Sequence, residues 1–342
     1  EVKAGGTPRF GMQTQYASSE TFTAPSGLQT KVTRTRTAVL SDPGDPFSMT
    51  SQLDQVDING RMFTSEFDVA SLTYTSTSPE GLVSSEQYDS LGRVVQQSIA
   101  AGISARKKTY GEFGLISRTT FGSQSLDFIY DASGDLASKT NALGETTKFE
   151  YDAMSRYSAL ILPSGRRYEY HYDALGNRTR ITMPSGAVHN LGYTVLGQDS
   201  TYTPPDSPRP LSSEYDNDRG YAATEYPSGQ RVTYLRDAQG RAAGVSYLDA
   251  EISINYLSAT SDRVTSITRT PTGGGTAETL SFTFDGSIID SYTMSGTVNG
   301  SYTFGYDNNM FLTGITFDGD PEMPVLSNRD GAVTGVGPFA IT

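Results

Sequence analysis

The sequence predicts an all-β protein built from antiparallel β-hairpin repeats of about 21 residues that pair into one continuous sheet. Three observations lead to this prediction. A tyrosine returns at nearly constant spacing, aromatic and polar residues alternate before it, and two turn motifs follow one another along the chain. A period this steady is typical of a repeat architecture, in which every copy is the same structural unit.

The repeat is defined by a tyrosine that is usually followed by aspartate. Successive copies are 19–22 residues apart, and a degenerate copy follows at Tyr306. The aligned residues are Tyr88, Tyr110, Tyr130, Tyr151, Tyr172, Tyr193, Tyr215, Tyr234 and Tyr256.

The residues before each tyrosine predict a β-strand, because aromatic and polar side chains alternate with a period of two. In RYEYHYD, the residues Tyr168, Tyr170 and Tyr172 share one face. Arg167, Glu169, His171 and Asp173 share the other. Each copy should therefore present an aromatic face and a polar face, with the tyrosines on a concave or covered side of the sheet.

Two turn motifs separate the strands. In the first, an Asp accepts hydrogen bonds from backbone N–H groups two residues on, and a Gly three residues later supplies the positive φ that closes the turn. In the second, P-S-G, Pro presets φ and Gly completes the turn. The predicted structural repeat residues, besides Tyr88, Tyr130, Tyr151, Tyr172, Tyr215 and Tyr306, are Asp89, Gly92, Asp131, Gly134, Asp152, Asp173, Gly176, Asp216, Asp237, Gly240, Asp307, Pro163, Gly165, Pro184, Gly186, Pro227 and Gly229.

Some copies lack one of these landmarks. Ser155 and Met310 stand where Gly would follow, and Thr194 replaces the Asp. We expect those turns to be looser or of another type. The Pro-rich stretch 200–211 and the Gly-rich stretch 270–278 break the period and predict insertion loops.

The domain organisation follows from the same pattern. Residues 1–76 carry degenerate copies, and residues 77–342 form the regular repeat region. Because repeats continue through both segments, we expect one continuous structural domain that is a fragment of a longer chain.

Composition narrows the possible partners. The formal net charge is −12, which disfavours nucleic acid because phosphate binding requires dense Lys and Arg patches. No run of eighteen apolar residues occurs, so we expect no membrane insertion by this segment. The chain has no cysteine, which excludes disulfides and thiolate metal sites, and no motif indicates a cofactor.

The pattern resembles the YD-repeat family, which includes bacterial Rhs proteins, the C components of Tc toxins and teneurins. The resemblance is carried by YDSLGR (88–93), YDALGNRTRITMPSG (172–186), RDAQGR (236–241) and NRDGAVTGVG (328–337). It implies a spiralling β-sheet that forms a shell or part of a shell. In Rhs and Tc proteins such a shell encloses a toxic domain, and in teneurins it is part of an adhesion receptor.

The sequence gives less support to interpretations of these residues as catalytic, metal-binding or modification sites. The DxxG motif occurs in nucleotide hydrolases, but it recurs here without a phosphate-binding loop. His171 and His189 are the two histidines, and SARK (104–107) lacks the companion motifs of a lactamase. The acidic residues Asp42, Asp45, Asp54 and Asp57 match no calcium loop, so a solvated loop is favoured. Sequons at Asn177 and Asn299 matter only in a glycosylating pathway.

We therefore expect a non-enzymatic structural shell segment of a secreted or surface-exposed bacterial protein, with no catalytic, cofactor or metal residues. Its partners would be the remainder of its own longer polypeptide or an encapsulated cargo domain. The alternative is an adhesion module that binds a glycan or a cell-surface protein. A β-rich carbohydrate-active enzyme is a third possibility, since its carboxylate pair need not be close in sequence.

Overall fold

The computed structural model describes residues 2–341, which form 31 β-strands and one 3₁₀ turn, η1 (Glu112–Gly114). The strands belong to one antiparallel sheet, so the all-β prediction is confirmed. Within residues 2–341, no helix is long and apolar enough to cross a membrane. The chain divides into two compact units.

Of the described residues, unit 1 contains 2–125, 283–292 and 300–341. Its first strands include β2, which has 13 residues. They are β1 (Val2–Thr7), β2 (Gly11–Thr23), β3 (Gln29–Leu40), β4 (Met49–Ile58), β5 (Arg61–Asp68), β6 (Thr73–Thr77), β7 (Val83–Tyr88), β8 (Val94–Ser98), β9 (Arg106–Tyr110) and β10 (Ile116–Phe121). Its later strands are β27 (Gly300–Tyr306), β28 (Leu312–Phe317), β29 (Met323–Ser327), β30 (Val333–Val336) and β31 (Phe339–Ala340). Three strands, β11 (Gln124–Tyr130), β25 (Glu278–Asp285) and β26 (Ile288–Ser295), are divided between the units.

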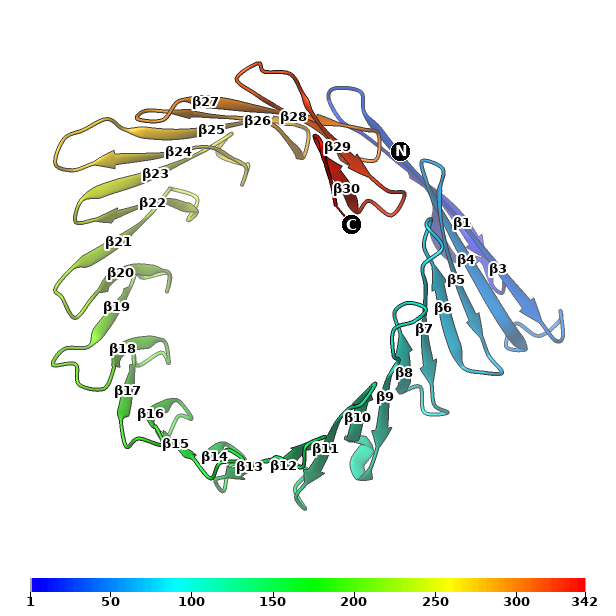
Figure 1. Ribbon diagram of the computed structural model, residues 1–342, viewed down its shortest axis with the longest axis horizontal. Coiled ribbons are helices and arrows are strands. Elements are labelled where there is room, and N and C mark those ends of the chain that lie inside the picture. The colour runs from blue at the N-terminus through cyan, green and yellow to red at the C-terminus, as the bar shows by residue number, and fades with distance from the viewer. Residues whose placement is uncertain (1, 342) are drawn as a thin grey trace. The chain divides into compact units, whose positions relative to one another are not determined.

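Unit 2 contains residues 126–282 and 293–299 and holds the most regular hairpins, which follow one another in chain order (Figure 1). Besides its part of β11, its strands are β12 (Leu136–Asn141), β13 (Thr146–Tyr151), β14 (Tyr157–Ile161), β15 (Arg167–Tyr172), β16 (Arg178–Thr182), β17 (Val188–Tyr193), β18 (Asp199–Thr203), β19 (Leu211–Tyr215), β20 (Tyr221–Glu225), β21 (Arg231–Arg236), β22 (Ala242–Tyr247), β23 (Ala250–Tyr256) and β24 (Val264–Pro271). The stretches expected as insertion loops lie outside strands only at 204–210 and 272–277.

The sheet has almost no core of its own. A compact monomer of 36.8 kDa would expose about 13,600 Å², whereas this chain exposes 20750 Å². The buried apolar residues among those described are Ala24, Ala159, Ala223, Ala250 and Val325. The aromatic rings are mostly half-buried by neighbours on the same face. The chain is thus a single layer of sheet, stabilised by contacts between neighbouring strands.

A β-bulge recurs at the end of nine hairpins, next to the turn. In the hairpin of β15 and β16, Tyr172 pairs with Arg178 and His171 pairs with Arg180, so Thr179 is the additional residue. The same register shift occurs in the hairpins that end at Tyr88, Tyr130, Tyr151, Tyr193, Tyr215, Arg236, Tyr256 and Tyr306. Because a bulge bends its strand and increases the local twist, one bulge per hairpin bends each repeat in a similar way.

Candidate functional site

The DxxG turn is a closed network of hydrogen bonds around one carboxylate. Asp173 Oδ1 accepts from the backbone N–H of Leu175 at 2.9 Å and of Asn177 at 2.8 Å. Asp173 Oδ2 accepts from Asn177 Nδ2 at 2.9 Å, and these bonds lower the Asp173 pKa, the Asn177 side chain being the main cause. Gly176 closes the turn with φ of 90°. The Asn177 amide is therefore already bonded inside its own turn.

The same turn recurs in ten copies among the described residues, with a side-chain oxygen that accepts from the N–H groups two and four residues on. The sequence analysis missed one of them, Asn141 in NALG, where Asn precedes Gly by three residues as in NRDG (328–331). A search for Asn as well as Asp would have found it. The ten acceptors are Asp89, Asp131, Asn141, Asp152, Asp173, Thr194, Asp216, Asp237, Asp307 and Asn328.

The copies without a landmark residue keep this turn, so the expectation of looser turns is wrong. Ser155 and Met310 have φ of 55° and 60° and replace Gly in the left-handed conformation. Arg219 does the same with φ of 65°. In the copy that begins at Thr194, the hydroxyl replaces the carboxylate as acceptor. The repeat framework therefore imposes the turn on residues that do not favour it.

An arginine links each of three turns to the next repeat. Arg156 Nε donates to Asp152 Oδ2 at 2.7 Å, and its guanidinium lies 4.5 Å from the centre of the Tyr172 ring. The bond from Arg156 is the main cause of the lowered pKa of Asp152. Cation–π contacts of this kind add to the burial of the ring. The other two sets are Asp89, Arg93 and Tyr110, and Asp237, Arg241 and Tyr256.

The tyrosine hydroxyl explains why Tyr recurs in place of Phe. Tyr172 Oη donates to the backbone carbonyl of Tyr157, 15 residues earlier, at 2.9 Å. Hydrogen bonds of this kind join seven of the repeats to the preceding one, that of Tyr172 included. The other pairs of tyrosine and carbonyl residue are Tyr110 and Val94, Tyr151 and Leu136, Tyr193 and Arg178, Tyr215 and Asp199, Tyr256 and Ala242, and Tyr306 and Ile289.

Tyr88 and Tyr234 differ from this scheme. Tyr88 Oη donates to Glu86 Oε2 at 2.8 Å. Tyr234 is not at the repeat position, because the bulge and the turn place Arg236 there, opposite Ala242. The alignment on Tyr234 was therefore wrong by two residues. Arg236 Nε lies 3.5 Å from Asp216 Oδ2, which again connects one repeat to the preceding one.

The polar face carries ion pairs that bridge three strands. Arg167 of β15 forms a bidentate pair with Glu150 of β13, with distances of 2.9 and 2.7 Å. Ala159 of β14 is fully buried and pairs in register with Glu150 on one side and Glu169 on the other, the two glutamates that Arg167 bonds. A similar pair joins Glu214 and Arg231, and the fully buried Ala223 is in register with Glu214 and with Thr233, two residues from Arg231. Alanine is small enough to lie beneath the pair, and each pair lowers the pKa of its glutamate.

In unit 1, turns from late in the sequence bind hairpins from early in the sequence. Asp330 Oδ2 accepts from the Ser78 hydroxyl at 2.6 Å, and Asp330 Oδ1 accepts from the Glu80 N–H at 3.1 Å. Asn308 accepts from Gln29 N–H at 3.0 Å through its side chain and from Asn59 Nδ2 at 2.9 Å through its carbonyl. We call this set of contacts the junction.

Further contacts extend the junction on both sides. Arg61 donates to Asn309 Oδ1 at 3.2 Å, and its guanidinium lies 4.4 Å from the centre of the Phe311 ring. Asp285 accepts from the Ser26 N–H at 2.8 Å and from the Ser26 hydroxyl. The junction uses side chains of the repeat turns themselves, and no periodicity in the sequence indicates which hairpin each turn meets.

The remaining candidate site residues are the two histidines and the aspartates near the N-terminus. His171 lies exposed on β15, and His189 Nδ1 is 2.8 Å from the Tyr202 hydroxyl, with the two rings stacked. The carboxylates of Asp42, Asp45 and Asp57 accept backbone N–H bonds near their own turns, and Asp54 pairs with Arg36. Among residues 2–341, no three His, Asp or Glu side chains are grouped to hold a metal ion.

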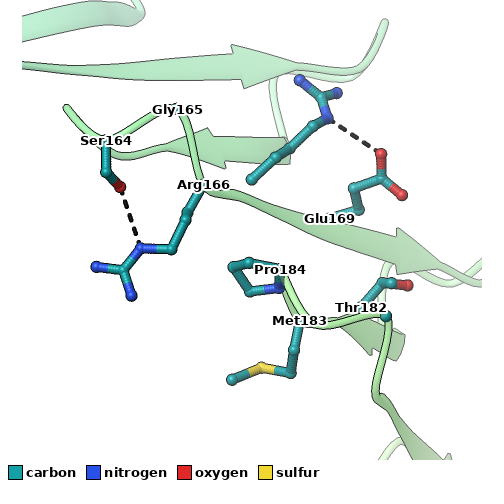
Figure 2. A pocket seen from close by; sticks show the side chains of 9 residues that line it. Ser164, Gly165, Arg166, Glu169, Thr182, Met183 and Pro184 are labelled. Atoms are coloured by element: carbon teal, nitrogen blue, oxygen red, sulfur yellow. Dashed lines mark hydrogen bonds and ion pairs between the residues drawn. The ribbon is translucent and has the colours of Figure 1, made fainter.

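Figure 2 shows a shallow depression beside two P-S-G turns of unit 2. Arg166 Nε donates to the Ser164 hydroxyl at 3.0 Å, and Arg167 Nε donates to Glu169 Oε1 at 3.0 Å. Pro184 and the apolar end of Met183 form the opposite side. Both arginines of the depression are therefore bonded to neighbouring side chains.

Comparison with known structures agrees with this architecture. A crystal structure of TcdB2-TccC3-Cdc42 is similar with a TM-score of 0.62 at 12% identity, covering 94% of this chain and 21% of that one. A crystal structure of TcdB2-TccC3 gives a TM-score of 0.57 at 12% identity, covering 90% and 22%. The Photorhabdus luminescens Tc holotoxin pore gives 0.52 at 12% identity, covering 91% and 21%. At this identity the likeness is one of fold, and the chain spans about a fifth of each of these proteins.

The sequence itself identifies the family. No curated protein matches it. Residues 11–342 match the family described as the teneurin YD-shell, which is nearly the whole chain and includes every repeat described above. The protein therefore belongs to the teneurin YD-shell family.

Proposed function

We propose that this chain is a wall segment of a larger YD-repeat shell, which encloses or presents a toxin or other cargo of a secreted or surface-exposed bacterial protein. The observation that carries the proposal is the single-layered sheet, which exposes 20750 Å² and buries only a few small side chains. A sheet of this kind is suited to separating two compartments, because each of its faces is free to meet a different neighbour.

The repeat residues support a structural role without a reaction of its own. Carboxylates such as Asp152 and Asp173 are occupied by turn N–H groups and neighbouring side chains. Glu150 and Glu214 are held in ion pairs. A catalytic carboxylate must be free to exchange a proton or to meet a substrate. The partners we propose are the remainder of the same polypeptide and a cargo domain within it.

Limited proteolysis of the natural full-length polypeptide tests the proposal. If the repeats form a wall around cargo, the cargo region should be cut much more slowly in the intact protein than when it is expressed alone. A matched protein in which the segment 126–282 is deleted should lose that protection. Equal cleavage of the cargo region in all three samples would contradict the proposal.

A further inference from the structure

A depression on one face of unit 1 lies across five neighbouring strands, β6 to β10. Its lining includes a row of five residues, one from each strand, that are paired consecutively in register. Residues directly opposite one another on neighbouring strands lie on the same face of a sheet. The row consists of Tyr74, Glu86, Gln97, Arg106 and Phe121.

The centre of the row is polar and partly preorganised. Glu86 Oε1 accepts from Gln97 Nε2 at 2.7 Å, and Glu86 Oε2 accepts from the Tyr88 hydroxyl at 2.8 Å. These two bonds lower the pKa of Glu86 and keep its carboxylate ionised, and the bond from Gln97 has the larger effect. Each carboxylate oxygen still has a lone pair for a ligand hydroxyl, because an ionised carboxylate accepts about four hydrogen bonds.

Arg106 differs from the arginines of the repeat turns in the bonding of its side chain. Its side chain is exposed in the depression, and no hydrogen bond or ion pair to it occurs within residues 2–341. Arg93, Arg156 and Arg241, in contrast, bind the aspartate of their own turns. A free guanidinium is a bidentate donor suited to a carboxylate.

The ends of the row are aromatic, and its margin is rich in hydroxyls. Tyr74 and Phe121 flank the polar centre, and the Phe121 side chain is partly exposed. Ser76 and Ser84, which pair with each other, lie two residues along the same face. At about 4.8 Å per strand, the row is roughly 19 Å long, which suits a chain of several linked rings.

We propose that this depression binds an acidic oligosaccharide. Arg106 binds the carboxylate of a sugar acid, Glu86 and Gln97 bond its hydroxyls, and Phe121 packs against the apolar face of a ring. An extended peptide is less suited, because β7, β8 and β9 each have strand partners on both sides and offer no free edge for strand addition. The site is independent of the shell role proposed above.

Calorimetric titration of the chain with a galacturonate tetramer and with its methyl ester tests the proposal. The ester keeps the rings and hydroxyls but removes the charge. The acid should bind, and Arg106→Gln should weaken it about tenfold or more, as expected for loss of a charge-assisted bidentate bond. Phe121→Ala should weaken both probes.

Lys107→Gln is the matched control, because it removes the same charge from the next residue of β9, on the opposite face. It should leave the affinity for the acid within about twofold. Failure of the tetramer to bind, equal binding of acid and ester, or an equal loss in the Lys107 variant would overturn the proposal. Tighter binding of a tetraglutamate peptide than of the sugar acid would overturn it in favour of a peptide ligand.

Discussion

The hairpins of unit 2 and the junction of unit 1 differ in how far along the sequence their partners lie. In unit 2, the Tyr172 hydroxyl bonds a carbonyl 15 residues away and Arg167 reaches Glu150, 17 residues away. In the junction, Asp330 and Ser78 are 252 residues apart. Bringing together two residues at the longer separation costs the unfolded chain about 2 kcal/mol more in loop-closure entropy than at the shorter separation. Junction contacts should therefore form after the repeats that carry them.

This difference separates two kinds of stability. Contacts between adjacent repeats give a stability that is roughly a sum of local terms, so damage remains local. The junction joins two distant parts of unit 1, so damage there should loosen both parts together. The predictions below test this distinction by native-state hydrogen exchange, which reports the free energy of opening segment by segment.

The largest expected effect is that of Ala159→Leu in unit 2. Ala159 is fully buried beneath the Arg167–Glu150 pair, so a larger side chain must displace the pair or its own strand. The opening free energy of β13 to β15 should fall by about 3 kcal/mol. Ala153→Leu, at an exposed turn position, is the control and should change it little. An equal loss of protection throughout unit 2 would show that the repeats are not locally additive.

Asp330→Ala tests the junction. It removes the acceptor of two bonds, from the Ser78 hydroxyl and the Glu80 N–H. Opening of residues 73–88 and of residues 323–336 should each become easier by about 2 kcal/mol. Asp320→Ala, at an exposed carboxylate in the turn that precedes β29, is the matched control. Faster exchange confined to the segment around residue 330 would contradict long-range coupling.

Most of the repeat could be predicted from sequence, because its signals are local. Alternation in RYEYHYD predicts a strand, and Asp173 with Gly176 predicts a turn. The shared turn at Ser155 and Thr194 could not be predicted, since neighbouring repeats impose it against local preference. No sequence signal indicates the bulge that places Arg236, and not Tyr234, at the repeat position. Junction partners such as Ser78 and Asp330 depend on how distant hairpins meet.

Tyr172→Phe removes one bond between adjacent repeats while keeping the ring. The Tyr172 hydroxyl donates to the Tyr157 carbonyl at 2.9 Å, and Arg156 still covers the ring. Opening of β14 and β15 should become easier by about 1 kcal/mol, with no change in unit 1. Exchange rates that match the unaltered chain would show that the recurrent hydroxyl does not hold the repeats together.

Alkaline pH should weaken the same kind of bond at Tyr215. Burial raises the pKa of its phenol to about 12, and the hydroxyl donates to the Asp199 carbonyl. The unfolded phenol titrates near 10, so this stabilisation is fully present below pH 10 and is lost as the pH rises through 12. The urea midpoint of the chain should fall over that range. Tyr215→Phe should make the fall shallower, and an identical slope in both proteins would exclude this role.

The smallest expected effect is a gain. Ser155 has φ of 55° in a turn where other copies have Gly. Ser155→Gly relieves that strain but adds freedom to the unfolded chain, so the turn should be stabilised by about 0.5 kcal/mol. Ser133→Gly, at a turn position without positive φ, should not stabilise its own turn. Loss of stability in the Ser155 variant would mean that the serine is not strained.

The most direct test of the account is hydrogen exchange measured by mass spectrometry on the unaltered chain and on the Ala159→Leu and Asp330→Ala variants together. We predict faster exchange only in β13 to β15 and their immediate neighbours for the first variant. For the second we predict faster exchange in both 73–88 and 323–336, with unit 2 unchanged. Uniform changes across the whole chain in either variant would contradict the distinction between local repeat contacts and a long-range junction.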